Sequence, residues 1–519
     1  MAEQNKCKDK GVDYDSSSDE TEDYSNSDDE GKSGYRKGGY HPVNIGDVYN
    51  SRYTVHRKLG WGHFSTVWLA TDSQVDDNHP HKCVALKIQK SASQYTEAAE
   101  DEIDLLWEIK KKGKDGPGGK YCVELLNHFK VYGPHGKHIC MVFEVMGKNL
   151  LHLIKRFKYR GIPLNICKRI TYQILIGLDF LHKECKIIHT DLKPENFLLL
   201  PDQPPSAKAL LEERKALLAL QNLKIQEGLK CLNLSDGKLT KKERKKLKEK
   251  LRKQAALEIT KMVNKGNFKN KAFPRPERAE GAEGEGILGA SVSSTSMSST
   301  ASGLGFKPEG ASKELYITKI SDLGNGCWIH KHFTDDITTR QYRSPEVILG
   351  LPYSCPTDIW SVACMVFELI TGDYLFDPKE DKYGKHCRDE DHLALMVELL
   401  GKFPKKMCLS GKHSRNFFNR KGELRNIKKL DFWALEDILL EKYKMNPKEA
   451  KELADFLHPM LHFNPKHRQT AGQAIQSKWF RSIRADYPLD LKATPNAPDS
   501  QSTSANTTLT SPHSDDQKK

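Results

Sequence analysis

Long hydrophobic runs are absent from this chain of 519 residues. No segment approaches the roughly 18 consecutive apolar residues of a membrane-spanning helix, and the N-terminal MAEQNKCKDK lacks the apolar centre of a secretory signal. The 12 cysteines are scattered, and no two of them have the C-x-x-C spacing of many metal and redox sites. We therefore expect a soluble intracellular protein without membrane contact, whose cysteines are reduced.

Aromatic residues are absent from the most basic part of the chain. Residues 241–253, KKERKKLKEKLRK, carry nine basic and two acidic side chains, and the whole chain has a net charge of +13. Such a run attracts nucleic acid by charge but offers no ring for base stacking. A nucleic-acid-binding protein stays open as an alternative, although direct nucleic-acid binding is not required. A solvated helical linker explains the run nearly as well.

Basic residues are in turn absent from residues 13–30, which hold nine acidic side chains interleaved with serines. A segment of this composition cannot build a core, so we expect residues 1–48 to be disordered and order to begin just after them. Gly, Ser and Ala dominate residues 281–305, which is typical of a flexible linker. We expect disorder also in residues 485–519 and through most of residues 201–313.

The remaining sequence carries strand and helix patterns. Alternating apolar residues on both sides of GWGHFSTV indicate a hairpin of two strands, and CVALKI (83–88) indicates a third. Residues 97–110 have helical spacing, and residues 166–182 form a strongly apolar helix. This order predicts an α+β protein with a small β-rich lobe and a larger α-helical lobe. The predicted boundaries are 53–147 for the first lobe, 148–200 and 314–484 for the second, and 201–313 for the insert that splits it.

A glycine-rich string and a lysine come first among the residues that can carry chemistry. GWGHFSTV follows the pattern G-x-G-x-x-G-x-V at Gly60, Gly62 and Val67, with Ser65 in place of the third glycine. Such glycines let backbone N–H groups approach a phosphate, although any glycine-rich hairpin gives this signal. Lys87 follows in VALK. It is either an ordinary edge charge or a phosphate-binding cation that a helix carboxylate orients.

The helix predicted at 97–110 offers several such carboxylates. The candidates are Glu100, Asp101, Glu102 and Glu108. We choose Glu102 because it directly precedes an apolar stripe that begins with Ile103 and Leu106, and residues next to such a stripe face the core. An exposed helix charge is the competing interpretation for each of them.

The string HTDLKPENF (189–197) is the strongest signal, and it directly follows the apolar helix. Its Asp, Lys and Asn are side chains that can orient a hydroxyl proton, neutralise a phosphate and bind a metal ion. A second carboxylate, Asp322 in SDLGNG, lies 131 residues beyond Asp191. Because the cost of closing a loop grows only logarithmically with its length, the insert can separate these residues in sequence without separating them in space.

In this order the strings resemble the protein-kinase fold, and more closely the SR-protein kinases of the CMGC group. The resemblance covers about residues 38–200 and 314–482, and WGHFSTVWL, HTDLKPENFLL, DLGNGCW and QYRSPEVILG carry it. LAMMER-type kinases share HTDLKPEN, but this chain has DEDHLALMVELLG where they carry their eponymous motif. A LAMMER-like dual-specificity kinase therefore stays an alternative. A pseudokinase scaffold that binds through the insert is another, less favoured because the catalytic residue types are present.

The resemblance implies a serine kinase that uses ATP and Mg²⁺. The implied catalytic residues are Asp191, Lys193, Lys87 and Glu102, and the implied metal ligands are Asn196 and Asp322. The implied ATP-binding residues are Leu59, Gly60, Gly62, Val67, Ala85, Lys87, Phe143, Glu144 and Met146. The structural anchors are Asp358, and Glu346 of the Ser-Pro-Glu string with Arg468 as its buried partner.

The resemblance also implies that the substrates are Arg-Ser-rich splicing factors. Residues 373–398 hold eight acidic residues against four Lys or Arg, and such a patch would attract an Arg-rich peptide. We expect this stretch to lie between the helix of Asp358 and the next helix; a solvated charged loop is the competing interpretation. The implied docking residues are Asp373, Asp391, Glu398 and Lys442. Arg340, Arg343 and Arg388 are expected near the substrate, where they would hold serines already phosphorylated.

The insert resembles the spacer of that family in position. We expect residues 201–313 to bind chaperones or import factors. Their deletion should therefore alter the location of the enzyme in the cell and leave its kinase activity unchanged. The enzyme is expected to be a monomer found in both cytoplasm and nucleus.

One residue of the catalytic string departs from the common kinase pattern. Thr190 stands where many kinases carry an arginine that pairs with a phosphorylated residue of the activation segment. A short neutral side chain cannot make that pair. The segment still contains Thr334, Thr338, Thr339 and Tyr342. Thr190 therefore predicts an activation segment that is held by fixed contacts and is active without phosphorylation.

Overall fold

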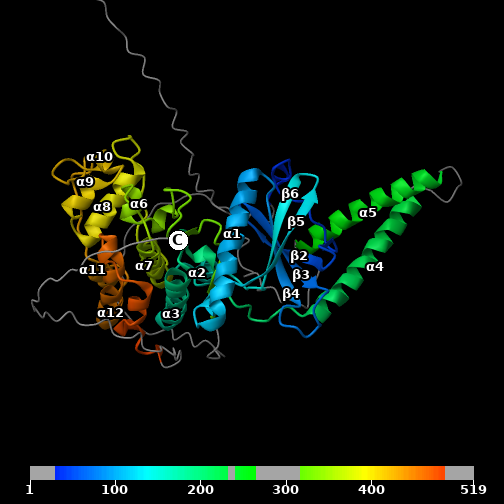
Figure 1. Cartoon of the computed structure of the whole chain (residues 1–519), viewed down its shortest axis with the longest axis horizontal. Coiled ribbons are helices and arrows are strands. Elements are labelled where there is room, and N and C mark those ends of the chain that lie inside the picture. Colours follow the sequence, from blue (N-terminus) through cyan, green and yellow to red (C-terminus); the bar gives the residue numbers. More distant parts are fainter. Residues whose placement is uncertain (1–29, 232–239, 265–315, 485–519) are drawn as a thin grey trace, which may run out of the picture.

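The computed structural model describes residues 30–231, 240–264 and 316–484. A small lobe built on one sheet lies beside a larger helical lobe (Figure 1). The strands are β1 (Val48–Tyr49), β2 (Tyr53–Trp61), β3 (Ser65–Asp72), β4 (Cys83–Gln89), β5 (Leu125–Gly133), β6 (Gly136–Phe143), β7 (Ile187–Ile188), β8 (Phe197–Leu199), β9 (Thr318–Ile320) and β10 (Cys327–Trp328). The helices are α1 (Ser93–Lys112), α2 (Leu150–Arg156), α3 (Leu164–Phe180), α4 (Ala207–Cys231), α5 (Lys241–Asn264), α6 (Pro345–Ile348), α7 (Pro356–Thr371), α8 (Arg388–Leu400), α9 (Lys405–Ser410), α10 (Ser414–Phe417), α11 (Leu435–Glu441), α12 (Pro447–Leu457) and α13 (Ala471–Ile475).

The sheet of the small lobe has the order β1-β2-β3-β4-β6-β5, with antiparallel neighbours. The predicted hairpin is β2 and β3, and its loop is the glycine-rich string. Gly60 pairs with Val67, and Val67 pairs with Lys87 on the next strand. Because paired residues in neighbouring strands lie side by side, the register puts the glycine loop and the lysine in one row.

Helix α1 places its acidic residues according to the helical period. Its buried side includes Ala99, Glu102, Ile103, Leu106 and Ile109, which recur every three or four residues. The lysines of its last turn complement the negative end of the helix dipole. Glu102 therefore enters the protein with the apolar stripe, as the sequence indicated.

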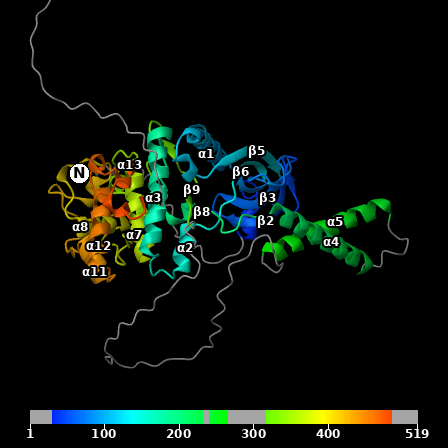
Figure 2. The same cartoon turned by 90° about the horizontal axis from the view of Figure 1, so that it is seen from below.

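The large lobe is built around α3 and α7, whose side chains are mostly buried. Strand β8 follows the catalytic string and pairs with β9, which follows the insert; Phe197 pairs with Ile320 and Leu199 with Thr318. Figure 2 shows the two strands side by side. The expectation that the insert separates Asp191 and Asp322 in sequence but not in space is confirmed, because the strands that flank the insert pair with each other.

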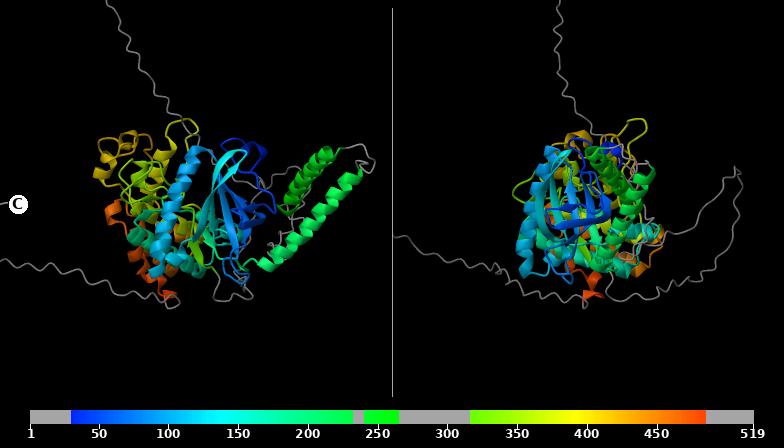
Figure 3. Two further views of the ribbon diagram at one scale, coloured as in Figure 1. Left: turned by 45° about the vertical axis from the view of Figure 1, so that its right-hand side comes forward. Right: turned by 90° about the vertical axis from the view of Figure 1, so that its right-hand side faces the viewer.

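The described part of the insert forms two long helices. α4 and α5 extend away from the sheet of the small lobe as a pair (Figures 1 and 3). Leu210 packs with Leu69 and Cys83 of the sheet, and Ile259 of α5 lies in a cluster that contacts Ile45. A helix was expected for the basic run 241–253, which lies in α5. The disorder expected elsewhere in the insert is wrong for α4 and for the rest of α5, because these helices bury apolar side chains against the small lobe. Residues 265–313 lie outside the described residues. No described helix is both long and apolar enough to cross a membrane.

A second correction concerns the N-terminal region. Residues 30–48 were expected to be disordered, yet the structure describes them against the small lobe, and Tyr40 and Val43 are buried, as is Tyr49 directly after them. The acidic composition that motivated the expectation ends at Glu30, whereas the buried aromatic residues follow it. Residues 1–29 and 485–519, for which disorder was also predicted, lie outside the described residues.

Candidate active site

An ion-pair cluster joins the two lobes. The Lys87 Nζ atom lies 2.9 and 3.0 Å from the two carboxylate oxygens of Glu102 and 3.2 Å from Asp322 Oδ1. The Glu102 side chain is 2% exposed and that of Asp322 is 52% exposed. The carboxylate chosen from the sequence is thus the one that reaches Lys87. Glu100 pairs with Lys130 on β5 instead.

The electrostatics of this cluster keep its members charged where a phosphate or a cation would bind. Burial by itself would lower the pKa of Lys87, but the carboxylates of Asp322 and Glu102 outweigh it and raise that pKa. The positive charge of the Lys87 ammonium lowers the pKa of Asp322. Burial raises the pKa of Glu102, and Lys87 opposes that change. Lys87 therefore keeps its positive charge, and the Asp322 carboxylate is ionised.

The catalytic string closes around Asp191 through a compact polar network. Asp191 Oδ1 accepts a hydrogen bond from the Thr339 hydroxyl (2.7 Å), and Lys193 Nζ donates to the same hydroxyl oxygen (2.9 Å). Lys193 Nζ also lies 3.0 Å from Asp191 Oδ2. The Asn196 amide donates to the backbone carbonyl of Asp191 (2.8 Å). The three residues singled out in the string therefore share one site, and Thr339 links two of them.

Asp358, on α7, holds the backbone of the catalytic string by hydrogen bonds. Its carboxylate, which is fully buried, accepts from the backbone N–H groups of His189 (2.8 Å) and Thr190 (2.9 Å), and it bonds to the His182 ring (2.8 Å). The backbone at Thr190 is left-handed, with φ of +68°, a conformation that costs a β-branched residue energy. The charge-assisted bonds from Asp358 hold the strained turn in place, so the anchor role expected for Asp358 has a geometric basis.

Thr190 itself contacts the segment that follows Asp322. Its hydroxyl donates to the backbone carbonyl of Asn325 (2.7 Å), and the Asn325 amide donates to Asp191 Oδ2 (3.3 Å). The residue that replaces the usual arginine thus connects the catalytic string to the start of the activation segment by an uncharged bond. An activation segment held by fixed contacts was expected from the sequence, and this hydrogen bond is a contact of that kind.

The far end of the activation segment is held by a buried ion pair. The two carboxylate oxygens of Glu346 accept from the guanidinium of Arg468 at 2.7 and 2.9 Å, and neither side chain is exposed. Arg468 also donates to the backbone carbonyls of Pro356 and Phe463. The bidentate geometry and the additional bonds satisfy a charge that would otherwise be costly to bury.

Most of the predicted ATP-binding residues lie on strands of the small lobe, close to the ion-pair cluster of Lys87. Ala85 pairs with Phe143 across β4 and β6, and Ala85 and Met146 are buried, while Leu59 is 38% exposed. A side chain added at Gly60 or Gly62 would meet no atom within 4 Å, so the loop backbone borders open space. This open space leaves room for a triphosphate to approach the loop backbone closely.

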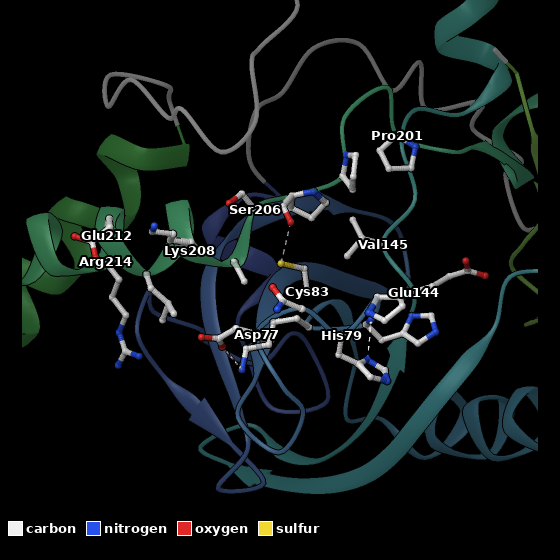
Figure 4. A pocket seen from close by; sticks show the side chains of 18 of the residues that line it. Asp77, His79, Cys83, Glu144, Val145, Pro201, Ser206, Lys208, Glu212 and Arg214 are labelled. Carbon is white, nitrogen blue, oxygen red and sulfur yellow. Dashed lines mark hydrogen bonds and ion pairs between the residues drawn. The ribbon is translucent and has the colours of Figure 1, made fainter. Parts of the chain in front are cut away.

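Glu144 is the exception among these residues. Its carboxylate accepts from Lys319 Nζ (2.6 Å) and from the Glu124 backbone N–H (2.8 Å), so only its backbone remains for ATP. The side chain also lines a cavity of about 1170 Å³ between the β3–β4 loop, residues 144–145 and the start of α4. Figure 4 shows Glu144, Val145 and Cys83 at this cavity, opposite Ser206 and Pro201. Among the predicted site residues, Glu144 alone lines it, so the cavity is separate from the catalytic residues.

The expected docking residues divide into two groups. Asp373 Oδ2 accepts from Lys442 Nζ (3.0 Å) and from the Tyr443 hydroxyl (2.8 Å), and the side chains of Asp373 and Lys442 are half exposed. Asp391 and Glu398 lie seven residues apart on α8 and therefore share one face of that helix. The structure pairs Asp373 with Lys442 and aligns the other two acids.

Helix α8 corrects the expected layout of the acidic stretch. Residues 388–398 do not belong to a connection between helices, because α8 begins at Arg388. Glu390 is buried and accepts from the backbone N–H (2.6 Å) and the side-chain amide (2.7 Å) of Asn426, so it is unsuited to a peptide-binding surface. Acidic residues occupy the first turn of α8, where they complement the helix dipole.

The three arginines expected near the substrate each have a partner in the structure. Arg340 forms an ion pair with Asp389, Arg343 donates to the carbonyl of Thr338 (2.8 Å), and Arg388 donates to that of Pro378 (3.2 Å). Burial lowers the pKa of His392, and the positive charges of Arg340, Arg343 and Arg388 lower it further. The charges of all three arginines therefore act on one buried, neutral ring.

Two residues of the site were missed in the sequence. Thr339 touches both Asp191 and Lys193, and Asn325 touches Asp191 and Thr190. Thr339 was noted only as one of several hydroxyls of the activation segment. Its distance of 148 residues from Asp191 leaves no local signal, whereas Asn325 lies only three residues after Asp322.

Comparison with known proteins identifies the family to which this chain belongs. The family model described as "Protein kinase domain" matches residues 53–208 and 310–480, on both sides of the insert. The chain is 42% identical over 477 residues to protein kinase dsk1 of Schizosaccharomyces pombe, covering 89% of this chain and 86% of the relative. It is 44% identical over 464 residues to the serine/threonine-protein kinase SRPK of Physarum polycephalum, covering 88% and 92%.

Similarity extends to animal proteins. The chain is 40% identical over 514 residues to SRSF protein kinase 3 of Homo sapiens, which covers 86% of this chain and 89% of the relative. The match therefore includes the lobes on both sides of the insert and the strings that carry the catalytic residues. The split kinase fold, the paired Lys87 and Glu102, and the network around Asp191 agree with these relationships. The chain belongs to the SR-protein kinase family and is a serine/threonine protein kinase.

Proposed function

We propose that this kinase transfers phosphate from ATP to serines of Arg-Ser-rich proteins, such as SR splicing factors, and so regulates pre-mRNA splicing. The observation that carries the catalytic part is the network in which Lys193 and Thr339 contact the carboxylate of Asp191. A carboxylate held in this way can orient a substrate hydroxyl and take up its proton, while the neighbouring ammonium offsets charge on the transferred phosphate.

Magnesium fits the side chains at this site. Asp322 offers an ionised and half-exposed carboxylate, and the Asn196 amide nitrogen is engaged by Asp191, so its carbonyl oxygen is the atom that would bind a cation. Mg²⁺ typically binds through one or two such oxygens together with substrate phosphates and water. When bound, the ion would neutralise phosphate charge.

Acidic side chains on and near α8 support the proposal that the substrates are basic. Asp391 and Glu398 share a helix face, and Asp373 lies half exposed on the same lobe. An acidic surface raises the encounter rate of an Arg-rich peptide and the salt dependence of its binding. We expect the double substitution of Asp391 and Glu398 by lysine to raise KM for an Arg-Ser peptide and to leave KM for ATP unchanged. Glu449→Lys, at an exposed acid of α12, is the matched control.

The arginines around His392 are proposed to hold serines that are already phosphorylated. Guanidinium groups bind phosphate in bidentate fashion, and the charges of all three arginines act on His392. Each already has a protein partner, so a phosphoserine would have to compete with Asp389 for Arg340. Replacing Arg340, Arg343 and Arg388 by alanine should reduce the number of phosphates added per encounter with a multi-serine substrate. Unchanged processivity would contradict this role.

The activation segment is proposed to be active without phosphorylation. The hydrogen bond from Thr190 to the Asn325 carbonyl and the ion pair of Glu346 with Arg468 support its two ends. Neither contact needs a phosphate. Control of such a kinase would then depend on its location, and we propose that it acts as a monomer in both cytoplasm and nucleus, with the insert binding chaperones or import factors.

Substrate class is tested by paired peptides. Purified enzyme is incubated with labelled ATP and either an Arg-Ser repeat or a Lys-Ser repeat, which have the same charge and the same acceptor. Rapid labelling of the Arg-Ser peptide alone supports the proposal, because only guanidinium groups form bidentate bonds with carboxylates. Equal labelling of both would reject arginine selection, and labelling of neither would reject the activity itself.

A further inference from the structure

Residues 34–41, which we name the strap, form a hydrogen-bonded turn that precedes β1. The Tyr40 backbone N–H donates to the Gly34 carbonyl (2.9 Å), and the Gly39 N–H donates to that of Arg36 (2.8 Å), which closes a turn. A side chain at Gly39 would lie 2.1 Å from the Gly34 carbonyl oxygen. Gly38 has φ of +83°, in the left-handed region that glycine favours. The turn therefore depends on its two glycines.

The strap is attached to two other parts of the small lobe. The Gly38 N–H donates to the carbonyl of His135 in the β5–β6 turn (3.1 Å). The Gly38 carbonyl accepts from the Ala92 N–H (3.0 Å), and the Gly39 carbonyl accepts from the Ser91 N–H (3.2 Å), directly before α1. Backbone bonds on both sides fix the strap relative to the sheet and to the helix that carries Glu102.

From this fixed position Tyr40 reaches the glycine-rich loop. Its hydroxyl donates to the Gly62 carbonyl at 2.7 Å, and the residue is 4% exposed. The Lys90 ammonium lies 4.5 Å from the centre of the Tyr40 ring, and the Lys90 backbone N–H donates to the Phe64 carbonyl (2.8 Å). The Phe64 ring in turn packs against Tyr95 of α1, with 5.5 Å between ring centres. The tip of the loop is thus held from the strap and from α1.

The bonded carbonyl belongs to the base of the loop hairpin. The Gly62 N–H donates to the Ser65 carbonyl (2.9 Å), and the Ser65 N–H donates back to Gly62 (3.3 Å), leaving His63 and Phe64 as the turn. A bond to Gly62 therefore restrains the whole turn. Glycine-rich loops are otherwise free to move, and freezing such a loop costs conformational entropy when a ligand binds.

We propose that Tyr40 is a positioning residue for ATP. Through its bond to Gly62, the strap holds the glycine-rich loop over the nucleotide before ATP arrives, so that little ordering remains to be done on binding. The strap thereby becomes part of the nucleotide site. This inference rests on the assignment of ATP to the cleft bordered by Gly60 and Lys87.

The test is Tyr40→Phe, which removes the hydroxyl and keeps the ring. Loss of one hydrogen bond is expected to raise KM for ATP about three- to tenfold. The change in kcat should be much smaller, because Asp191 and Lys193 are untouched. Hydrogen exchange of the peptide that spans residues 59–66 should become faster, while exchange in the large lobe stays the same. Tyr132→Phe, at a tyrosine that is 79% exposed on β5, is the matched control.

Gly39→Ala provides a second variant, since the new methyl group would push the strap off the Gly34 carbonyl and displace Tyr40 by another route. It should raise KM for ATP as Tyr40→Phe does. A Tyr40→Phe enzyme that melts at a lower temperature but keeps the wild-type KM and the wild-type exchange at residues 59–66 would overturn the proposal. Wild-type protein without ATP turnover would instead reject the proposed function.

Discussion

Thr190→Val tests the uncharged bond that replaces the usual arginine contact. Valine has nearly the same shape as threonine and the same branch at Cβ, so the strain at φ of +68° is retained and only the hydroxyl is lost. The bond that disappears is the one to the Asn325 carbonyl, 2.7 Å long. The expected effect is a weaker hold on Asn325 and, through it, on Asp191.

The magnitude follows from the surroundings of the two atoms. Thr190 is 1% exposed, but Asn325 is exposed, so water can reach the carbonyl that loses its donor. We therefore take the low end for a buried hydrogen bond, about 1 kcal/mol, which corresponds to a factor of about five in an equilibrium. The kcat should fall by up to about fivefold. The KM for ATP should change little, because the Lys87 ion pairs are not touched.

The assay is steady-state phosphorylation of an Arg-Ser peptide, together with hydrogen exchange of the peptide that spans residues 322–328. Thr190→Ser is the matched control, since it keeps the hydroxyl, and it should retain the wild-type kcat. A valine variant with unchanged kcat and unchanged exchange would refute the role of this bond. Equal losses in the valine and serine variants would point to the Cβ branch instead.

Three further predictions concern stability. Arg468→Ala leaves the Glu346 carboxylate buried without its partner and should lower the free energy of unfolding by about 3–5 kcal/mol in urea titrations; a loss below about 1 kcal/mol would contradict the importance of this pair. Burial raises the pKa of Glu368 to about 7, so the stability that its protonated form contributes is complete below pH 4.5 and is lost as the pH rises through 7. Glu368→Gln keeps an acceptor for the Tyr342 hydroxyl and should therefore raise the melting temperature more at pH 8 than at pH 5, whereas an equal gain at both would show that the carboxyl does not titrate in this range. Deleting residues 265–313 should leave the melting temperature unchanged, but deleting all of 201–313 should lower it, because α4 and α5 cover Leu69, Cys83 and Ile45; equal melting temperatures would mean that the helices do not stabilise the lobe.

The sequence was informative where chemistry requires particular residue types at fixed spacing. Lys87 and Asp322 could be placed because each stands in a short string with a recognisable strand beside it. Glu102 could be chosen among four carboxylates because helical periodicity decides which of them enters the core. The closeness of Asp322 and Asp191 across the insert was also expected, and the pairing of β8 with β9 explains it.

Contacts between distant segments could not be predicted in this way. No feature of the sequence predicts that Thr339 bonds to Asp191 or that Tyr40 bonds to Gly62. Both bonds depend on how distant segments pack. The N-terminal region was judged from its acidic composition, which stops just before the buried aromatic residues. Helix α8 did carry a local signal, since acids in a first turn favour a helix N-terminus, and that signal was interpreted only as negative charge.

The most direct test of the account measures activity in the absence of phosphate on the activation segment. Enzyme made in bacteria is treated with phosphatase, and mass spectrometry verifies that residues 322–346 are unmodified. Its initial rate on an Arg-Ser peptide with ATP and Mg²⁺ is then compared with that of untreated enzyme. The account predicts equal rates, because the contacts of Thr190 and Glu346 need no phosphate. A treated enzyme that is inactive, and that regains activity when the segment is phosphorylated again, would contradict it.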